Sequence, residues 1–177
     1  SSKMCGLSNL DALSDREFAI WLAAFFDGEG CISASLRCPR GTARRRHIGF
    51  SLIVMLGIGQ HERYEGLLHY MARRLGYGYV CPAARNNLRY ATNNHCEVRQ
   101  FLNSVAPFLA VKAHRLPAMY RLLDIKDEVS RYRGRGKQGW SLTVPLALIV
   151  EFARLSTTVN AKTNGERQNG RSLSVLM

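Results

Sequence analysis

The sequence predicts an α+β protein with a curved antiparallel sheet, and two observations support this fold class. Helix-like and strand-like segments follow one another in the order αββαββα, with further helical segments after them. The strand-like segments come in neighbouring pairs, and the clearest of them places apolar residues at every second position. We expect a single domain over residues 1–155, with extra C-terminal helices, and a polar tail over residues 156–177.

The first expected helix covers residues 14–26. Ser14 is a good N-cap, and Glu17 completes a capping box three residues later. Apolar residues spaced four apart make one side of this helix broadly apolar. Gly28 and Gly30 are expected to end it, because glycine is common just beyond the last turn of a helix.

Two strands follow, over residues 31–37 and 47–59, with a basic loop between them. The second strand has the clearest pattern in the chain, because large apolar residues at alternate positions fall on one face. They are Ile48, Phe50, Leu52, Val54, Leu56 and Ile58.

The rest of the chain continues with helices and one hairpin. A helix is expected over residues 61–75, ended by Gly76, and a hairpin is expected from residues 77–81 and 88–92. The next helix spans residues 94–109 and is capped by Asn94 and Glu97. Helices over residues 113–125 and 143–155 follow, with a basic, glycine-bearing loop at 131–137 between them.

The charge balance points to nucleic acid. Lys and Arg number 25 against 13 Asp and Glu, which gives a net charge of +12 and a pI near 10.0. A charge this large repels itself, and a phosphate backbone is its natural partner. The arginines lie in strand- and loop-like segments, whereas a membrane-surface protein would carry them on a basic amphipathic helix.

Composition also bounds where the protein works. No apolar run is long enough to span a membrane, and the first residues lack the layout of a signal peptide. We expect no membrane association and an intracellular protein, cytoplasmic in a prokaryote and organellar or nuclear in a eukaryote. The five cysteines form an odd set without metal-binding spacing, which is typical of reduced thiols.

Two carboxylates, Asp27 and Glu29, crowd the C-terminal end of the first helix. The helix dipole makes that end negative, so each anion there costs roughly 0.3–1 kcal/mol. A divalent cation would offset this cost, and Mg²⁺ prefers one or two carboxylates together with water and phosphate oxygens. The alternative is that Asp27 caps a neighbouring turn and Glu29 is solvated. These residues alone leave both interpretations open.

The segment from Trp21 to Gly30, WLAAFFDGEG, resembles the motif of the LAGLIDADG homing endonucleases. The resemblance continues through Gln60 at the end of the long strand, LGYGYV before the hairpin, and the string PFLAVK that ends at Lys112. Ala24 stands where the motif usually has glycine, and we expect it to widen helix packing slightly. The family's fold implies that the curved αββαββα sheet forms a DNA-binding saddle.

The resemblance also implies an active site. Glu29 would bind the catalytic metal together with the carbonyl of Gly28, and Asp27 would be mainly structural. Gln60 and Lys112 would be catalytic, the lysine as a cation near the scissile phosphate. The implied cofactor is Mg²⁺, which Mn²⁺ can replace, whereas Ca²⁺ is expected to bind without supporting cleavage.

One further active-site residue of the family, an arginine, falls on Tyr64 in this chain.

Only one copy of the motif is present, so we expect a homodimer whose two-fold axis supplies one active site for each DNA strand. The motif helices would form the dimer interface, through Trp21, Ala23, Ala24 and Asp27.

Side chains that alternate along a sheet can read base edges in the major groove of double-stranded DNA. The expected DNA-binding residues are Ser33, Ser35, Arg37, Arg44, Arg46, His47, Ser51, Ile53, Met55, Arg85, Asn86, Asn87 and Arg89, with Lys162 on a phosphate.

The predicted function is therefore that of an intron-encoded homing endonuclease. It would make a metal-dependent double-strand cut with short 3′ overhangs in a long, roughly two-fold symmetric target. The alternatives are an RNA maturase with intron RNA as its partner, a non-cleaving DNA-binding regulator of the same fold, and an unrelated basic RNA-binding protein. Glu29 argues against the regulator, and the RNA-binding protein would not need the Asp27–Glu29 pair.

Overall fold

Residues 8–37, 51–132 and 144–160 are described by a computed structural model of the chain. Their regular elements are α1 (Ser8–Asp11), α2 (Asp15–Glu29), β1 (Gly30–Arg37), β2 (Ser51–His61), η1 (Glu62–Tyr64), α3 (Glu65–Leu75), β3 (Tyr79–Pro82), β4 (Asn87–Thr92), α4 (His95–Val105), η2 (Ala106–Phe108), η3 (Ala113–Arg115), α5 (Leu116–Arg131) and α6 (Leu146–Asn160). The predicted order αββαββα, followed by more helix, is confirmed.

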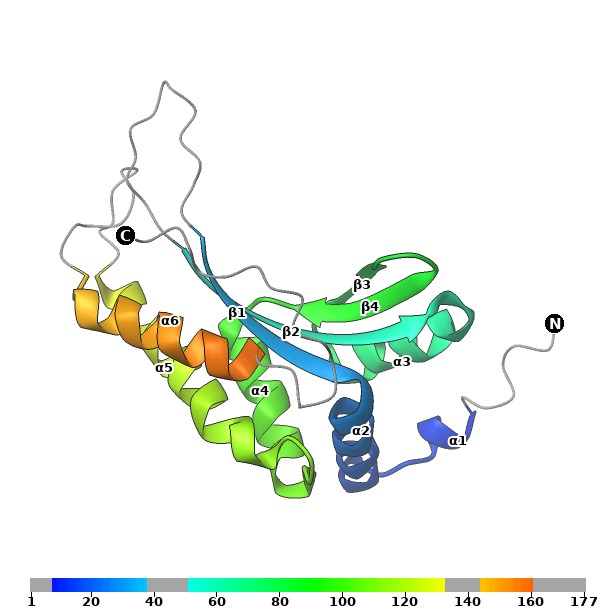
Figure 1. Cartoon of the computed structure of the whole chain (residues 1–177). Helices are drawn as coiled ribbons and strands as arrows, with labels where there is room; N and C mark the ends of the chain where they lie inside the picture. Colours follow the sequence, from blue (N-terminus) through cyan, green and yellow to red (C-terminus); the bar gives the residue numbers. More distant parts are fainter. Residues whose placement is uncertain (1–7, 38–50, 133–143, 161–177) are drawn as a thin grey trace.

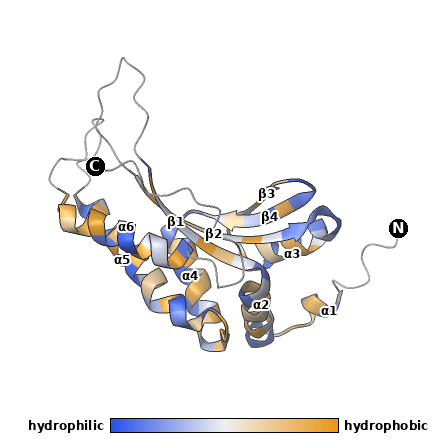
Figure 2. Ribbon diagram, viewed as in Figure 1, coloured by the Kyte–Doolittle hydropathy of each residue, from blue (hydrophilic) through white to orange (hydrophobic). Residues whose placement is uncertain are grey.

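The four strands form one antiparallel sheet in the order β1-β2-β4-β3. Helices α2, α3, α4 and α5 lie on one face of this curved sheet, and the other face, called here the open face, carries none of the described helices (Figure 1). Hydrophobic and hydrophilic residues are interspersed along the strands (Figure 2).

The alternating apolar residues of β2 determine which face of the sheet packs against the helices. The described members of the apolar row are fully or almost fully buried: Leu52, Val54, Leu56 and Ile58. Burial of each such side chain contributes about 1.5–3 kcal/mol. The core continues into the helices, where the rings of Phe26 and Phe101 meet edge-to-face at 5.2 Å.

Helix α2 begins as predicted and ends later. The Ser14–Glu17 capping box is present, with the Ser14 N–H donating to the Glu17 carboxylate at 2.8 Å. The helix runs through Gly28 to Glu29, because the Gly30 N–H still donates to the Phe26 carbonyl. The prediction that Gly28 ends the helix was wrong, and both motif acids lie in its last turn.

The C-terminal helices also differ from expectation. Helix α5 begins at Leu116 and reaches Arg131, and α6 continues to Asn160, past the predicted end at residue 155. Asn160 explains the longer α6, since its side-chain amide pairs with the backbone of Ala34 on the edge strand β1, at 3.0 Å and 2.8 Å. This pairing satisfies backbone groups that an edge strand leaves open.

Among the helices of residues 8–37, 51–132 and 144–160, none combines the length and apolarity that a membrane crossing requires.

Candidate active site and nucleic-acid interface

Asp27 clamps a loop against the end of α2. Its carboxylate accepts backbone hydrogen bonds from Ala110 at 2.8 Å, Lys112 at 2.9 Å and Val111 at 3.1 Å. Partial burial alone would raise the pKa of Asp27, but these three donors and the charge of Lys112 together lower it. Asp27 therefore has a structural role in this chain, since it joins two segments that are far apart in the sequence.

Lys112 caps the same helix end from the other side. Its Nζ donates to the Phe26 carbonyl at 2.8 Å and to the Asp27 carbonyl, and it lies over the Phe26 ring. Burial lowers the pKa of Lys112, although the negative charges of Asp27 and Glu29 act in the opposite direction. A cation at a helix C-terminus offsets the helix dipole. The structure thus explains how α2 tolerates two acids in its last turn.

Glu29 lies where α2 meets the open face. Its side chain is exposed, and its carboxylate accepts no hydrogen bond from the described residues. A hollow of about 430 Å³ begins at this side chain and ends at the tip of the β3–β4 hairpin. It is lined by Glu29, Gly59, Gln60, His61, Ala83, Ala84, Asn87 and Arg89. The structure therefore brings the predicted Glu29 and Gln60 together, with Lys112 behind them at the helix end.

The donor set at Glu29 fits a weakly coordinated divalent cation. No group of three His, Cys, Asp or Glu side chains that could hold a metal ion occurs within the described part of the chain. One exposed carboxylate with a neighbouring helix-end carbonyl, that of Gly28, suits Mg²⁺, which usually keeps several waters and takes phosphate oxygens. Thiolate-rich or histidine-rich sites would suit other metals.

The strand register gathers predicted DNA-binding residues on the open face. Ser33 pairs with Met55, and Ser35 with Ile53, at positions opposite to the buried apolar row. The remaining described candidates follow the same parity or lie in the β3–β4 turn: Arg37, Ser51, Arg85, Asn86, Asn87 and Arg89. Arg44, Arg46, His47 and Lys162 lie outside the described residues. DNA contact by all of these residues stays a prediction.

One face of α2 is apolar and accessible. Ala24 and Gly28 are exposed along it, Trp21 is half-buried, and Ile20 keeps 45% of its surface. Ala23, by contrast, has no exposed surface. Its place in the predicted dimer interface is therefore wrong, because it already packs in this chain's own core. Ile20, which was not among the predicted interface residues, lies on this exposed stripe at the helical spacing i, i+4, i+8 with Ala24 and Gly28.

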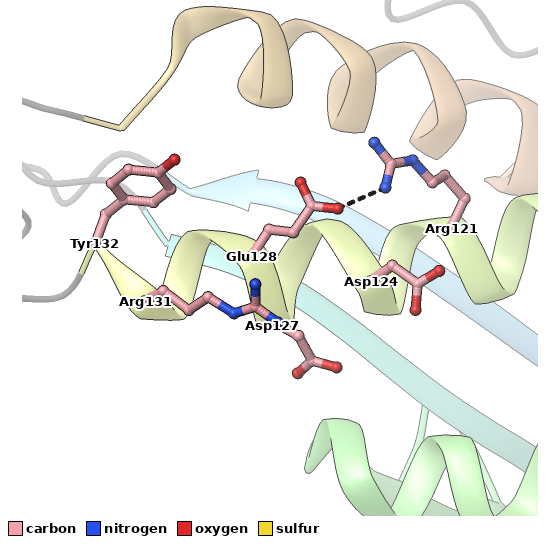
Figure 3. A pocket seen from close by; sticks show the side chains of 6 residues that line it. All are labelled: Arg121, Asp124, Asp127, Glu128, Arg131 and Tyr132. Atoms are coloured by element: carbon pink, nitrogen blue, oxygen red, sulfur yellow. Dashed lines mark hydrogen bonds and ion pairs between the residues drawn. The ribbon is translucent and has the colours of Figure 1, made fainter.

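Another hollow, of about 510 Å³, lies along α5 within the helix layer (Figure 3). Most of its charged side chains form ion pairs, either with each other or with residues of the neighbouring helices. Arg121 meets Glu128 at 2.7 Å and Glu151 at 2.7 Å, while Arg99 meets Asp124 at 2.8 Å. These ion pairs join α4, α5 and α6, so the cluster is structural and separate from the site at Glu29.

No family model and no curated protein matches the chain. Solved structures do match it. The homing endonuclease I-TnaI superposes with a TM-score of 0.63 at 15% identity, over 82% of this chain and 89% of that one. The homing endonuclease I-CvuI, in complex with the I-CreI target in the presence of magnesium and with DNA not cleaved, gives 0.64 at 20% identity, over 87% of both chains.

The LAGLIDADG homing endonuclease I-SmaMI, bound to cleaved DNA, gives a TM-score of 0.62 at 20% identity. The match covers 80% of this chain and 43% of the I-SmaMI chain. Identities this low show the fold alone. This chain has the α+β fold of the LAGLIDADG homing endonucleases, as the motif at Trp21 to Gly30 implied.

Proposed function

We propose that this protein is a site-specific homing endonuclease. As a homodimer it would make a metal-dependent double-strand cut, with short 3′ overhangs, in a long and roughly two-fold symmetric DNA target, and so support intron mobility. One observation carries the proposal. Glu29, an exposed carboxylate without a hydrogen-bonding partner among the described residues, shares a hollow with Gln60 where α2 meets the open face.

We infer a dimer because each chain carries only one candidate metal-binding carboxylate, Glu29. One chain offers a single Glu29 at the open face, and cutting two strands requires two such sites. The exposed stripe formed by Ile20, Ala24 and Gly28 fits an isologous contact with the same stripe of a second copy. Small residues at positions 24 and 28 allow two helix backbones to approach closely, which would bring both Glu29 side chains near the two-fold axis.

Each residue of the site has a definite task in this proposal. Glu29 and the Gly28 carbonyl would hold Mg²⁺, which supplies Lewis-acid stabilisation of phosphate oxygens and a more acidic bound water. Gln60 would orient the attacking water through its side-chain amide. Asp27 and Lys112 hold the end of α2 that carries Glu29, and Lys112 would in addition act as a catalytic cation near the scissile phosphate.

The strands of the open face are long enough to follow an extended stretch of DNA. Strands rise about 3.3 Å per residue and duplex DNA about 3.4 Å per base pair, so a ten-residue strand follows on the order of ten base pairs. β2, with 11 residues the longest of the described strands, is of this length, and its open-face positions are Ser51, Ile53, Met55, Gly57, Gly59 and His61. Two protomers would therefore cover a target about twice as long.

Glu29→Gln tests the proposal. The target duplex would first be recovered by binding selection from a randomised library, with the parent protein held in Ca²⁺. Glutamine keeps the size of the side chain and removes the charge that would hold the metal. We expect the variant to fold, dimerise and bind the duplex, and to cut neither strand in Mg²⁺. Glu65→Gln, an exposed exchange of the same kind on α3, is the matched control and should cut like the parent.

Mixed dimers sharpen this test, because one Glu29 should govern each cut. A dimer with one parent and one Glu29→Gln protomer should nick a single strand. Complete double-strand cleavage by Glu29→Gln would refute the metal-dependent mechanism. A parent protein that binds the duplex and never cuts it in Mg²⁺ would instead be a DNA-binding regulator.

A further inference from the structure

Arg89 on β4 reaches across the open face toward Glu29. Its register partner on β2 is Gly59, and the next residue of β2 on the same face is Gly57. A Cβ added to Gly57 would lie 2.8 Å from Cδ of Arg89 and 3.6 Å from Sγ of Cys31 on β1. The aliphatic part of the Arg89 side chain thus lies over β2 at two glycines, where no side chain blocks it. It points toward the start of β1.

This path brings a guanidinium into the hollow that Glu29 lines. Glu29 and Arg89 border it from opposite sides of β2, and Gln60 completes its wall. Within the described residues, Arg89 is the only Lys or Arg among the lining side chains. His61 also lines the hollow, but its Nδ1 accepts the Arg63 N–H at 3.2 Å, so this nitrogen is committed to capping η1.

Arg89 also differs from the arginines of the helix layer. Arg99 and Arg121 are held by carboxylates, and Arg74 donates to two backbone carbonyls. Arg89 is half-buried as a residue, and its guanidinium makes no hydrogen bond or ion pair with the described residues. Its five donors are therefore available for an anion in the hollow.

The residue at the position of the family's additional active-site arginine cannot fill this role. Tyr64 keeps 46% of its surface, and the guanidinium of Arg63 lies over its ring at 4.7 Å from the centroid. Neither residue lines the hollow. The cation that lines the hollow, Arg89, therefore comes from β4 and not from the segment that follows β2.

We propose that Arg89 is a catalytic residue of this chain whose guanidinium contacts the scissile phosphate; this rests on the proposed endonuclease function. In the reaction, the oxygen of a water molecule forms a bond to phosphorus as the bond from phosphorus to the leaving sugar oxygen breaks. The attacking water loses a proton to solvent, and the leaving oxygen gains one. Arg89 keeps its proton throughout and donates two hydrogen bonds to the non-bridging oxygens, whose negative charge grows in the transition state.

The experiment separates catalysis from base reading. Arg89→Ala, Arg89→Lys and the control Arg73→Ala, an exposed arginine on α3, would be compared on the selected duplex under single-turnover conditions with saturating protein. We expect Arg89→Ala to slow cleavage in Mg²⁺ by about 10²-fold or more. Affinity measured in Ca²⁺ should change by roughly tenfold at most, the effect of losing one phosphate contact. Arg89→Lys should recover part of the rate, and Arg73→Ala should behave like the parent.

A substitution at Gly57 tests the role of Arg89 without changing Arg89 itself. Gly57→Ala places a methyl group against Cδ of Arg89, which must swing away, whereas a Cβ at Gly59 meets nothing within 4 Å. Gly57→Ala should therefore slow cleavage, and the double variant with Arg89→Ala should be no slower than Arg89→Ala alone. Gly59→Ala should slow cleavage much less than Gly57→Ala.

The outcomes are distinguishable. A parent protein that does not cut would refute the proposed function itself. A parent that cuts, together with Arg89→Ala that cuts at the same saturated rate, would overturn only the role of Arg89. A variant that keeps this rate and accepts altered base pairs in the target would show that Arg89 reads a base edge, which also overturns the proposal.

Discussion

Asp27 and Lys112 show, at the scale of single residues, how a helix end can carry two acids. The carboxylate of Asp27 turns away from the open face and receives three backbone N–H groups from the loop at 110–112. The amine of Lys112 takes the carbonyls of Phe26 and Asp27. These contacts engage the charged carboxylate of Asp27 and leave that of Glu29 accessible.

The lowered pKa of Asp27 predicts a pH-dependent stability. Its folded pKa lies below the ordinary value of 3.8, so the carboxylate stabilises the fold fully above that value. This contribution is lost as the pH falls through the folded pKa. Asp27→Asn should therefore lower the free energy of unfolding at neutral pH, and its difference from the parent should shrink as the pH falls below about 4.

Urea denaturation at a series of pH values measures this difference. Asp11→Asn, an exchange of the same kind at an exposed acid, is the control, and it should give no such convergence. A parent–variant difference that stays constant from neutral to acid pH would show that Asp27 does not act through its charge.

Helix α2 combines two surfaces at the scale of the element. Its buried side, which includes Leu22, Ala23 and Phe26, completes the core under the sheet. Its other side leaves Ile20, Ala24 and Gly28 exposed, and we propose that a second copy of the chain covers them. The buried and the exposed residues lie on different sides of the same helix. The packing of the buried side in the core therefore fixes the direction in which the exposed stripe faces.

Ala24→Glu should therefore abolish dimerisation and leave the fold intact. A two-fold contact would place two new carboxylates near each other in the interface. Their desolvation and mutual repulsion would both oppose dimerisation. Sedimentation should show monomers for Ala24→Glu and dimers for both the parent and the control Ala12→Glu, whose residue is exposed outside α2. Equal dimerisation of all three proteins would place the dimer contact elsewhere.

Charge is unevenly distributed at the scale of the whole molecule. The acids of α5 and α6 are paired with arginines inside the helix layer, at Arg99 and Arg121. Arg37 and Arg89 lie instead on the open face, so the excess of 25 basic over 13 acidic residues is partly displayed there. A surface of this kind attracts phosphate by releasing condensed counterions.

DNA binding should for this reason fall steeply with salt. If two protomers make about six to ten phosphate contacts, the plot of log affinity against log salt concentration should have a slope of roughly −5 to −9. Fluorescence anisotropy of the selected duplex in Ca²⁺ at several salt concentrations gives this slope. A slope near about −1 would show that the positive charge serves another purpose.

The sequence alone predicted the fold class, which is confirmed, and most residues of the candidate site. Period-two and period-3.6 patterns are local, so the order αββαββα and the buried row Leu52 to Ile58 could be predicted. A resemblance whose motifs are also local indicated Glu29, Gln60 and Lys112 as site residues, and their roles stay predictions. The end of α2 was predicted too early, at Gly28 instead of Glu29, because the contacts that hold its last turn come from Lys112, far along the chain.

Only the tertiary structure decided how distant residues meet. The register of β4 on β2 sets Arg89 beside Gly57, and the burial of Ala23 directs the accessible stripe of α2. Neither fact has a local signal, since register and helix rotation depend on how the whole core packs. The sequence could name the acid that is expected to hold a metal, and the packing of the sheet decided which arginine lies across from it.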